Sequence, residues 1–215
     1  MKLYVNGDSH SCGHDAGGIK FSYGQRLADK LSATLVCDAV VGASNQRIIR
    51  TTTEYLKNNT PDFIVIGWST WEREEWLFDG KYYNVNSAGS DVLPNGLVQR
   101  YKQWVVEQAH NYEEHEILAH QQIVDFHAML IKRNIPHLFF NCYSYFSNAS
   151  LTIDWNNTYI NPYNEDFTYY YWLESQGYKP SNPKYYHYGA DAHIAWADFL
   201  LPYLTNTLNE SIITV

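Results

Sequence analysis

The sequence Gly7-Asp8-Ser9-His10-Ser11, near the start of the chain, places a potential nucleophile among polar groups. It follows a short apolar run that predicts a strand. A serine at the end of a strand and before a glycine-rich loop presents its hydroxyl at the sheet edge, beside backbone N–H groups that can stabilise an oxyanion. The alternative interpretation is an ordinary turn in which the Asp8 side chain bonds the backbone. Ser9 is therefore a candidate nucleophile.

Further polar residues follow the next two apolar runs. The segment Ser69 to Arg73 comes directly after the third run and contains a guanidinium, which binds a substrate carboxylate or phosphate bidentately. The alternative for Arg73 is an ion pair with one of the neighbouring glutamates, and the alternative for Trp68 is a place in the core beneath the lid. The residues that we expect to line a substrate site are Asp8, His10, Trp68, Thr70 and Arg73.

Apolar runs alternate with segments of helical periodicity along the chain. The predicted strands are Leu3 to Asn6, Thr34 to Val41, Phe63 to Trp68 and His137 to Tyr143, and the predicted helices cover Phe21 to Leu31, Ser44 to Leu56, Leu97 to Arg133 and Ala190 to Leu204. Ser44 suits a helix cap, and Asp191 suits the first turn of the last helix. This alternation predicts a three-layer α/β/α sandwich with a flavodoxin-like parallel sheet. Ligands of such sheets bind beyond the carboxyl ends of the strands, so the polar segments should converge there.

A length of 215 residues fits a single domain, residues 1–215. Two aromatic-rich segments, about 69–96 and 144–186, fall outside the alternation and are expected to be insertions. Long irregular connections in a compact domain are usually lids or binding walls.

Together these residues resemble the SGNH (GDSL-type) hydrolase family. Gly7-Asp8-Ser9 matches the first block of that family, which implies that Ser9 is the nucleophile. Gly42, after the second run, matches the glycine whose N–H helps to form the oxyanion hole. The third block departs from the family pattern, because Gly67-Trp68-Ser69-Thr70 lacks the asparagine of the oxyanion hole. Ser69, Thr70 or Asn45 is then expected to donate in its place.

The last block of the family carries an aspartate and, three positions later, the histidine that acts as base. By resemblance, His193 corresponds to a further histidine that opens the final helix in members of the family. In this alignment His187 is the base, and Lys184 stands where the aspartate belongs. A backbone carbonyl is then expected to orient His187. The alternative register makes His193 the base, with Asp191 nearby.

Composition excludes several classes of partner. A net charge of −8 without a basic cluster argues against nucleic acid, and no membrane-spanning segment or secretory signal is visible, which predicts a cytoplasmic protein. The three cysteines are widely spaced and are expected to be reduced core thiols. Histidine spacing matches no metal motif, so we expect neither a metal nor a cofactor.

The leading interpretation is a serine esterase or deacylase acting on a small-molecule acyl ester. The aromatic segments would suit an O-acetylated carbohydrate. The rival is a catalytically impaired binding or virion-assembly module that recognises a carbohydrate or protein. The chain also resembles phage-encoded SGNH-like proteins, which would imply association with a virion. The sequence does not indicate an oligomeric state.

Overall fold

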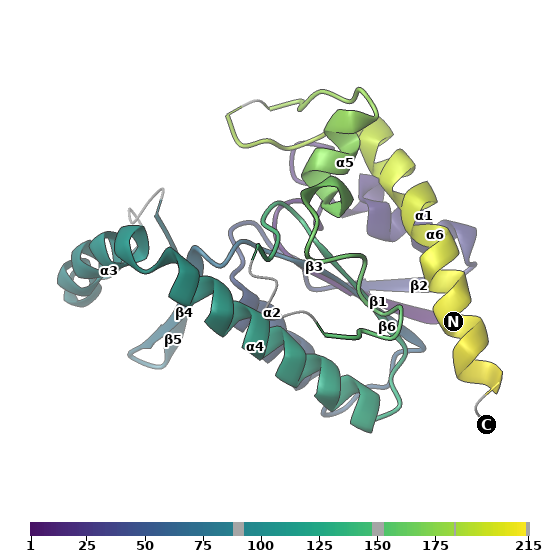
Figure 1. Ribbon diagram of the computed structural model, residues 1–215, viewed down its shortest axis with the longest axis horizontal. Coiled ribbons are helices and arrows are strands. Elements are labelled where there is room, and N and C mark those ends of the chain that lie inside the picture. The colour runs from purple at the N-terminus through teal and green to yellow at the C-terminus, as the bar shows by residue number, and fades with distance from the viewer. Residues whose placement is uncertain (88–92, 148–152, 183, 214–215) are drawn as a thin grey trace.

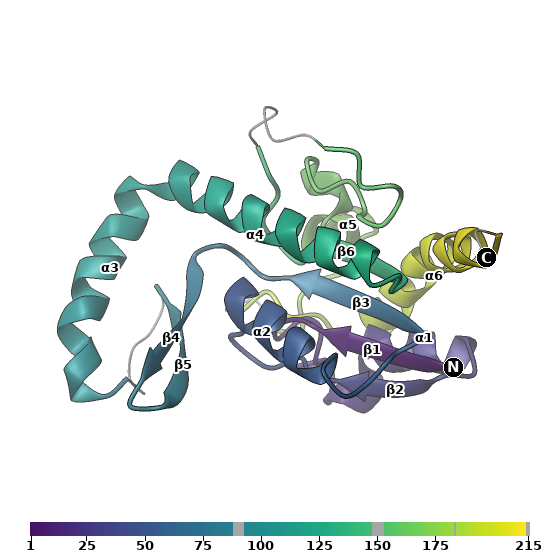
Figure 2. The same cartoon turned by 90° about the horizontal axis from the view of Figure 1, so that it is seen from below.

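The chain folds into three layers around a parallel sheet (Figures 1 and 2). The computed structural model describes residues 1–87, 93–147, 153–182 and 184–213. The sheet strands are β1 (Lys2–Asn6), β2 (Thr34–Cys37), β3 (Phe63–Trp68) and β6 (His137–Asn141). They are all parallel and lie in the order β2-β1-β3-β6. The predicted sandwich and its flavodoxin-like sheet are therefore confirmed.

The strands read as continuous apolar runs because both of their faces are covered. In β1, Leu3 and Val5 point to one face and contribute to a core that also contains Trp196. Tyr4 points to the opposite face, into a second core. All six residues of β3 are buried. Full burial of one such large apolar side chain stabilises the fold by about 1.5–3 kcal/mol.

Helices α1 (Tyr23–Lys30) and α6 (Ala190–Ile213) pack together on one face of the sheet. Helices α2 (Asn45–Tyr55) and α4 (Tyr112–Lys132) cover the other face. Ser44 caps α2, since its hydroxyl accepts a hydrogen bond from the Arg47 N–H. Both this cap and the position of Asp191 in the first turn of α6 agree with the prediction. No helix in the described part of the chain is long and apolar enough to cross a membrane.

Several predictions of element boundaries and content were wrong. The last helix, expected to end at Leu204, continues to Ile213. The helix expected over Leu97 to Arg133 is divided at Asn111 into α3 (Val98–His110) and α4. Strand β2 ends at Cys37, four residues before its predicted end. The insertion at 144–186 contains a short helix, α5 (Tyr169–Ser175). Short 3-10 turns cover Ile19–Phe21, Asn95–Leu97 and Glu165–Phe167.

The insertion at 69–96 contains a β-hairpin that the sequence analysis missed. Its strands, β4 (Arg73–Phe78) and β5 (Lys81–Asn86), are antiparallel and joined by Asp79 and Gly80. Both turn residues have positive φ, 47° and 74°, as a type I′ turn requires. The Asp-Gly pair between two aromatic runs was the available signal.

The hairpin and α3 lie at one end of the molecule and share a small core of their own (Figure 2). Trp76 and Trp104 meet edge to face in this core, with ring centroids 5.9 Å apart. The hairpin is tied to α2 by a bidentate pair in which Arg50 donates two hydrogen bonds of 2.7 Å to Glu75. The hairpin is therefore anchored to the body at this helix.

Two histidines, one from α4 and one from β6, are buried in contact with each other. The Nδ1 of His127 lies 2.9 Å from the Nε2 of His137, and the Nδ1 of His137 donates to the Ile135 carbonyl at 2.8 Å. Burial lowers the pKa of His137 to about 4 and lowers that of His127 as well. Both rings are therefore neutral at pH 7.

These histidines predict a loss of stability on acidification. Because the folded pKa of His137 lies below the unfolded value, its contribution is fully present above about pH 6.5 and is lost as the pH falls toward 4. We expect the free energy of unfolding, measured with urea, to fall between pH 7 and 5. The His137→Leu variant should be less stable at pH 7 but should lose about 1–2 kcal/mol less over that interval. An unchanged pH dependence in this variant would contradict the assignment.

Candidate active site

The loop after β1 folds into a tight turn that fixes Ser9. The Asp8 carbonyl accepts hydrogen bonds from the N–H groups of Ser11 and Cys12, and the Asp8 carboxylate accepts one from His10 N–H at 3.0 Å. Gly7 allows this turn to pack against β3, since a Cβ at this position would lie 2.8 Å from the Gly67 carbonyl oxygen and closer still to Ser11. The turn holds Ser9 at the carboxyl end of the sheet.

Ser9 and His187 form a direct hydrogen bond. The Oγ of Ser9 lies 2.9 Å from the Nε2 of His187, and both residues are buried. His187 is held in place by its own carbonyl, which accepts hydrogen bonds from the Asn182 N–H and the Ser181 hydroxyl. The two residues that the sequence analysis selected as nucleophile and base therefore lie in contact.

The second ring nitrogen of His187 bonds a carboxylate that the sequence analysis missed. The Nδ1 of His187 lies 2.8 Å from Asp15 Oδ2, and the Asn182 side chain donates to the same oxygen at 3.0 Å. The hydrogen bond from His187 keeps the pKa of Asp15 below its usual value. The expectation that a backbone carbonyl orients His187 was therefore wrong. Lys184, at the position where the resemblance placed an aspartate, instead extends its ammonium over the Tyr185 ring.

Asp15 comes from the same loop as Ser9, six positions further on. The loop coils back after Ser9, since His14 N–H donates to the Ser9 carbonyl, and this brings Asp15 toward His187. Asp15 adopts a φ of 62°, a conformation that L residues rarely occupy and that often marks functional sites. The available signal was that Asp15 is the only carboxylate in the sequence between Ser9 and Asp29.

The alternative base, His193, bonds other partners. Its Nδ1 accepts the Tyr23 N–H at 3.2 Å, and its Nε2 lies 3.3 Å from the Tyr169 hydroxyl. Burial lowers its pKa to about 3. Asp191 is exposed in the first turn of α6. The alternative that paired His193 with Asp191 was therefore wrong, because the ring of His193 is committed to α1 and α5.

A cleft of about 250 Å³ lies beside the pair of Ser9 and His187. Among its lining residues are Asp8 and His10, which flank Ser9 in the chain, and Tyr185 and Tyr186, which precede His187. Its remaining lining residues are Thr70, Glu72, Arg73, Tyr112, Tyr143 and Ser144. Four of the five predicted substrate-site residues thus share one cleft. Trp68 was predicted wrongly, because its side chain is buried in the core between Phe126 and Phe139.

Arg73 lies in a buried polar network rather than in a pair with a glutamate. Its Nη1 donates to Asp8 Oδ2 at 2.9 Å and to Ser69 Oγ at 2.8 Å. Burial raises the pKa of Asp8, but the positive charges of His10, which is protonated in the acid range where Asp8 titrates, and of Arg73 outweigh it, and the pKa lies below the usual value. Asp8 is therefore an ionised partner of Arg73.

The residues predicted as oxyanion donors have other partners in this network. Arg73 can only donate, so the single proton of the Ser69 hydroxyl is directed to Asp8, 3.1 Å away. The structure thus does not leave Ser69 Oγ available to an oxyanion. The Asn45 amide exchanges two hydrogen bonds with the backbone of Ser69, at 2.9 and 3.1 Å. Asn45 therefore positions the loop after β3.

Gly42 lies outside this network and has a φ of 74°. The preceding Val41 lines a separate hollow of about 720 Å³ together with His14 and Asp15. The role of the Gly42 N–H as an oxyanion donor stays a prediction.

His10 is a neutral ring between the cleft and His187. Burial lowers the pKa of His10 to about 4. Its ring meets that of His187 edge to face, with centroids 5.2 Å apart, and its Nδ1 is buried without a hydrogen-bond partner among the described residues. His10 therefore adds no positive charge beside His187 at neutral pH.

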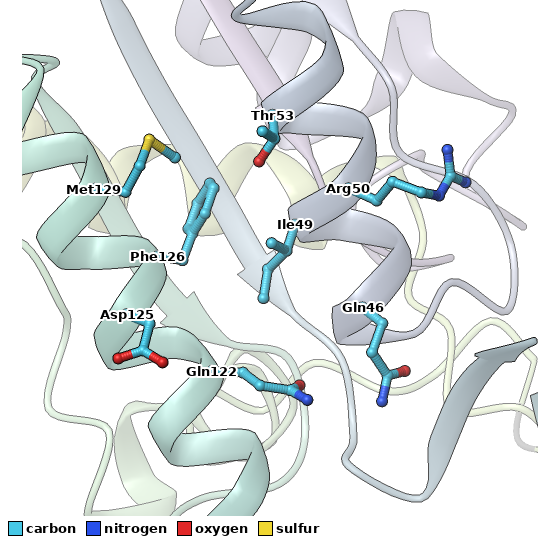
Figure 3. Close-up of a pocket in the computed structure, with 8 residues that line it drawn as sticks. All are labelled: Gln46, Ile49, Arg50, Thr53, Gln122, Asp125, Phe126 and Met129. Carbon is cyan, nitrogen blue, oxygen red and sulfur yellow. The ribbon is translucent and has the colours of Figure 1, made fainter.

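A further hollow of about 450 Å³ lies between α2 and α4 (Figure 3). Ile49 of α2 and Phe126 of α4 form part of its opposite walls. None of the residues that line it in the described structure was a candidate for chemistry. Ser9 and His187 are instead flanked by the cleft at Arg73.

Comparison with known proteins supports the fold. Residues 5–154 match the model of a family of unknown function, DUF6071. Among solved structures, the fold is similar to that of TesA, with a TM-score of 0.60 and 12% identity over 96% of this chain and 99% of that one. It is also similar to an acetyl xylan esterase, Est2A from Butyrivibrio proteoclasticus, with a TM-score of 0.53 and 18% identity over 97% of this chain and 64% of that one.

A third similar structure is a protein of Desulfitobacterium hafniense whose name places it in the G-D-S-L family of lipolytic proteins. Its TM-score is 0.51, with 12% identity over 94% of this chain and 98% of that one. No curated protein matches the sequence. At these identities the likeness establishes the fold alone, and the phage origin stays a prediction.

The Asp15 hydrogen bond predicts the tautomer of His187. Because the carboxylate accepts a proton from Nδ1, we expect the neutral ring to carry its proton on Nδ1 and to leave Nε2 free for Ser9. Nitrogen-15 NMR of the imidazoles, assigned with His187→Gln, should report this tautomer in the wild type. Asp15→Asn should alter the signal, whereas the matched control Asp191→Asn should not. The opposite pattern would refute this partnership.

Proposed function

The chain belongs to the family of unknown function DUF6071, and we propose that it is a serine hydrolase that cleaves acyl esters. The observation that carries this proposal is the continuous hydrogen-bond chain from Ser9 through His187 to Asp15. A hydroxyl, an imidazole and a carboxylate in this order form the arrangement that activates a serine for attack on a carbonyl. The acetyl xylan esterase among the similar structures is consistent with it.

In the first half of the reaction, Ser9 Oγ attacks the acyl carbon while His187 Nε2 takes its proton. The tetrahedral intermediate collapses when the protonated His187 passes this proton to the departing alkoxide, which leaves as an alcohol and gives an acyl-serine. Asp15 keeps the Nδ1 proton in place and stabilises the imidazolium that forms.

In the second half, a water molecule replaces the alcohol. His187 takes a proton from this water as it attacks the acyl-serine, and then returns the proton to Ser9 Oγ as the carboxylic acid leaves. The balance is one ester and one water consumed, and one alcohol and one acid formed. The reaction requires no cofactor.

The negative charge of the intermediate needs hydrogen-bond donors. The backbone N–H groups of Ser9 and Gly42 are the proposed donors, and Arg73 is the proposed source of positive charge in the cleft. Arg73 is the only lysine or arginine among the described residues that line the cleft, and its Nη1 already bonds Asp8 and Ser69. Preorganised charge of this kind lowers the barrier without reorganisation during the reaction.

The walls of the cleft favour a flat, polar substrate. Tyr143, Tyr185 and Tyr186 line it together with the polar side chains of Thr70 and Glu72. Tyrosine offers both an apolar face and a hydroxyl, which suits the pairing of apolar faces and hydroxyl groups on a sugar ring. An O-acetylated carbohydrate is therefore the proposed substrate class, and an acetyl xylan esterase is among the similar structures.

A binding module without turnover is the second candidate function. Its support is the third block, where Ser69 stands in place of the family's asparagine and directs its hydroxyl to Asp8. A cleft that binds an acylated sugar without hydrolysing it would retain the tyrosines and would not depend on Ser9. Turnover measurements separate the two candidates.

We predict that the wild type hydrolyses nitrophenyl acetate, a short-chain ester, and that Ser9→Ala and His187→Ala reduce kcat to background. Asp15→Asn should reduce kcat by about 10⁴-fold, because an amide favours the wrong tautomer of the base. A serine-directed phosphonate should label the wild type at Ser9. A wild type that neither turns over O-acetylated xylan or the nitrophenyl ester nor takes up the label would support the binding module instead.

Arg73 predicts a separate effect on the rate. Arg73→Met should lower kcat by about 100- to 1000-fold, the range found for loss of one oxyanion donor. Arg133→Met is the matched control, because the Arg133 guanidinium is also held by a hydrogen bond, to the Leu56 carbonyl, but belongs neither to the cleft nor to the hairpin. Equal kcat losses in the two variants would indicate a general structural effect and would refute the role of Arg73.

A further inference from the structure

A cluster of three potential metal ligands lies behind His187, on the side away from Ser9. The donor atoms of His14, Asp15 and His187 all lie within 4.8 Å of one another. We propose that this cluster is a regulatory site for a divalent transition metal, for which Zn²⁺ is the probe, and that metal binding and the activation of Ser9 exclude one another. The inhibitory consequence rests on the proposed esterase function, whereas metal binding does not.

The geometry places the Asp15 carboxylate between two imidazoles. Its Oδ2 lies 2.8 Å from His187 Nδ1, and its Oδ1 lies 3.8 Å from His14 Nε2. The two histidine rings meet edge to face with centroids 5.0 Å apart. Two imidazole nitrogens and one carboxylate oxygen are a ligand set that Zn²⁺ accepts, with a water in the fourth position.

The cluster is open to solvent on the side of His14. His14 and Asp15 line the hollow of about 720 Å³ described above. Tetrahedral bonds of about 2.0–2.2 Å to Zn²⁺ place the donor atoms about 3.4 Å apart. His14 Nε2, now 3.8 Å from Asp15 Oδ1, must therefore approach, while Asp15 Oδ2 must withdraw slightly from His187 Nδ1, now 2.8 Å away. The His14 side chain is 45% exposed and can move inward, whereas His187 is fixed by its neighbours. His14 therefore completes the site without disturbing the turn at Ser9.

The two states are exclusive because a neutral imidazole has one proton and one lone pair. To act as base, His187 needs its proton on Nδ1, facing Asp15, and its lone pair on Nε2, facing Ser9. To bind the metal beside Asp15, Nδ1 must offer the lone pair, so the proton moves to Nε2. In that tautomer His187 donates to Ser9 Oγ and cannot accept its proton. Metal binding thus converts the base into its inactive tautomer.

The first arm of the test measures binding without reference to activity. The purified chain is titrated with Zn²⁺ in competition with a chromophoric chelator, and one ion should bind per chain. His14→Gln should weaken binding by more than about tenfold, since loss of even a supporting group commonly costs 10- to 100-fold in metal affinity. His110→Gln is the matched control, because His110 is exposed on α3, and it should bind as the wild type does.

The second arm observes His187 directly. Nitrogen-15 NMR should show its proton on Nδ1 in the metal-free chain and on Nε2 after Zn²⁺ is added, and a chelator should reverse the change. Wild-type affinity in His14→Gln, or a His187 tautomer that Zn²⁺ leaves unchanged, would overturn the proposal.

The third arm connects the site to turnover. Zn²⁺ should inhibit hydrolysis of the nitrophenyl ester in the wild type, and His14→Gln should retain the wild-type rate while requiring more than about tenfold more Zn²⁺ for the same inhibition. Inhibition that is equal in both would place the inhibitory ion elsewhere and overturn the regulatory role. If the ester is not hydrolysed at all while Zn²⁺ still switches the tautomer, only the esterase proposal fails.

Discussion

The hydrogen bond between Asp15 and His187 joins two segments that lie 172 positions apart in the chain. One segment is the turn after the first strand, and the other precedes the last helix. The same carboxylate oxygen is held by Asn182, whose backbone N–H also holds the His187 carbonyl. If these segments separated, the His187 ring would lose its hydrogen bonds to Ser9 and Asp15, and the Ser9 hydroxyl would lose its base. The geometry of the site therefore depends on the docking of both ends of the chain on one sheet.

Much of this arrangement could be predicted from the sequence, because its causes are local. Strands buried on both faces give continuous apolar runs, and each run ends where the sheet ends, which locates the polar segments at one edge. The contact between Ser9 and His187 followed from the family resemblance and is present in the structure. Asp15 did not follow, because the resemblance placed the carboxylate beside the histidine in sequence, and no local pattern reveals a loop that coils back on itself.

The errors at Trp68, Ser69 and Asn45 have the same origin. Trp68 ends a strand, and a strand residue faces either the core or the site according to its register, which the sequence does not fix; here it faces α4. Ser69 and Asn45 have the chemistry of donors, but their hydrogen bonds are directed by Arg73 and by the backbone of the neighbouring loop. Side-chain type predicted where polar groups would gather, and tertiary packing decided which of them face the cleft.

The hairpin contributes Arg73 to the wall of the cleft, and its core is separate from the two cores that flank the sheet. Arg73 is the first residue of β4, while the side chains that hold the hairpin together, Trp76 and Trp104 among them, pack with one another rather than with the sheet. Elements of this kind open with a lower free energy than the global unfolding of a domain. Opening of the hairpin would break the Arg50–Glu75 and Arg73–Asp8 pairs but not the hydrogen bonds that join Ser9, His187 and Asp15. The cation of the cleft can therefore be withdrawn, and the cleft can widen for a bulky ligand, without unfolding of the sheet.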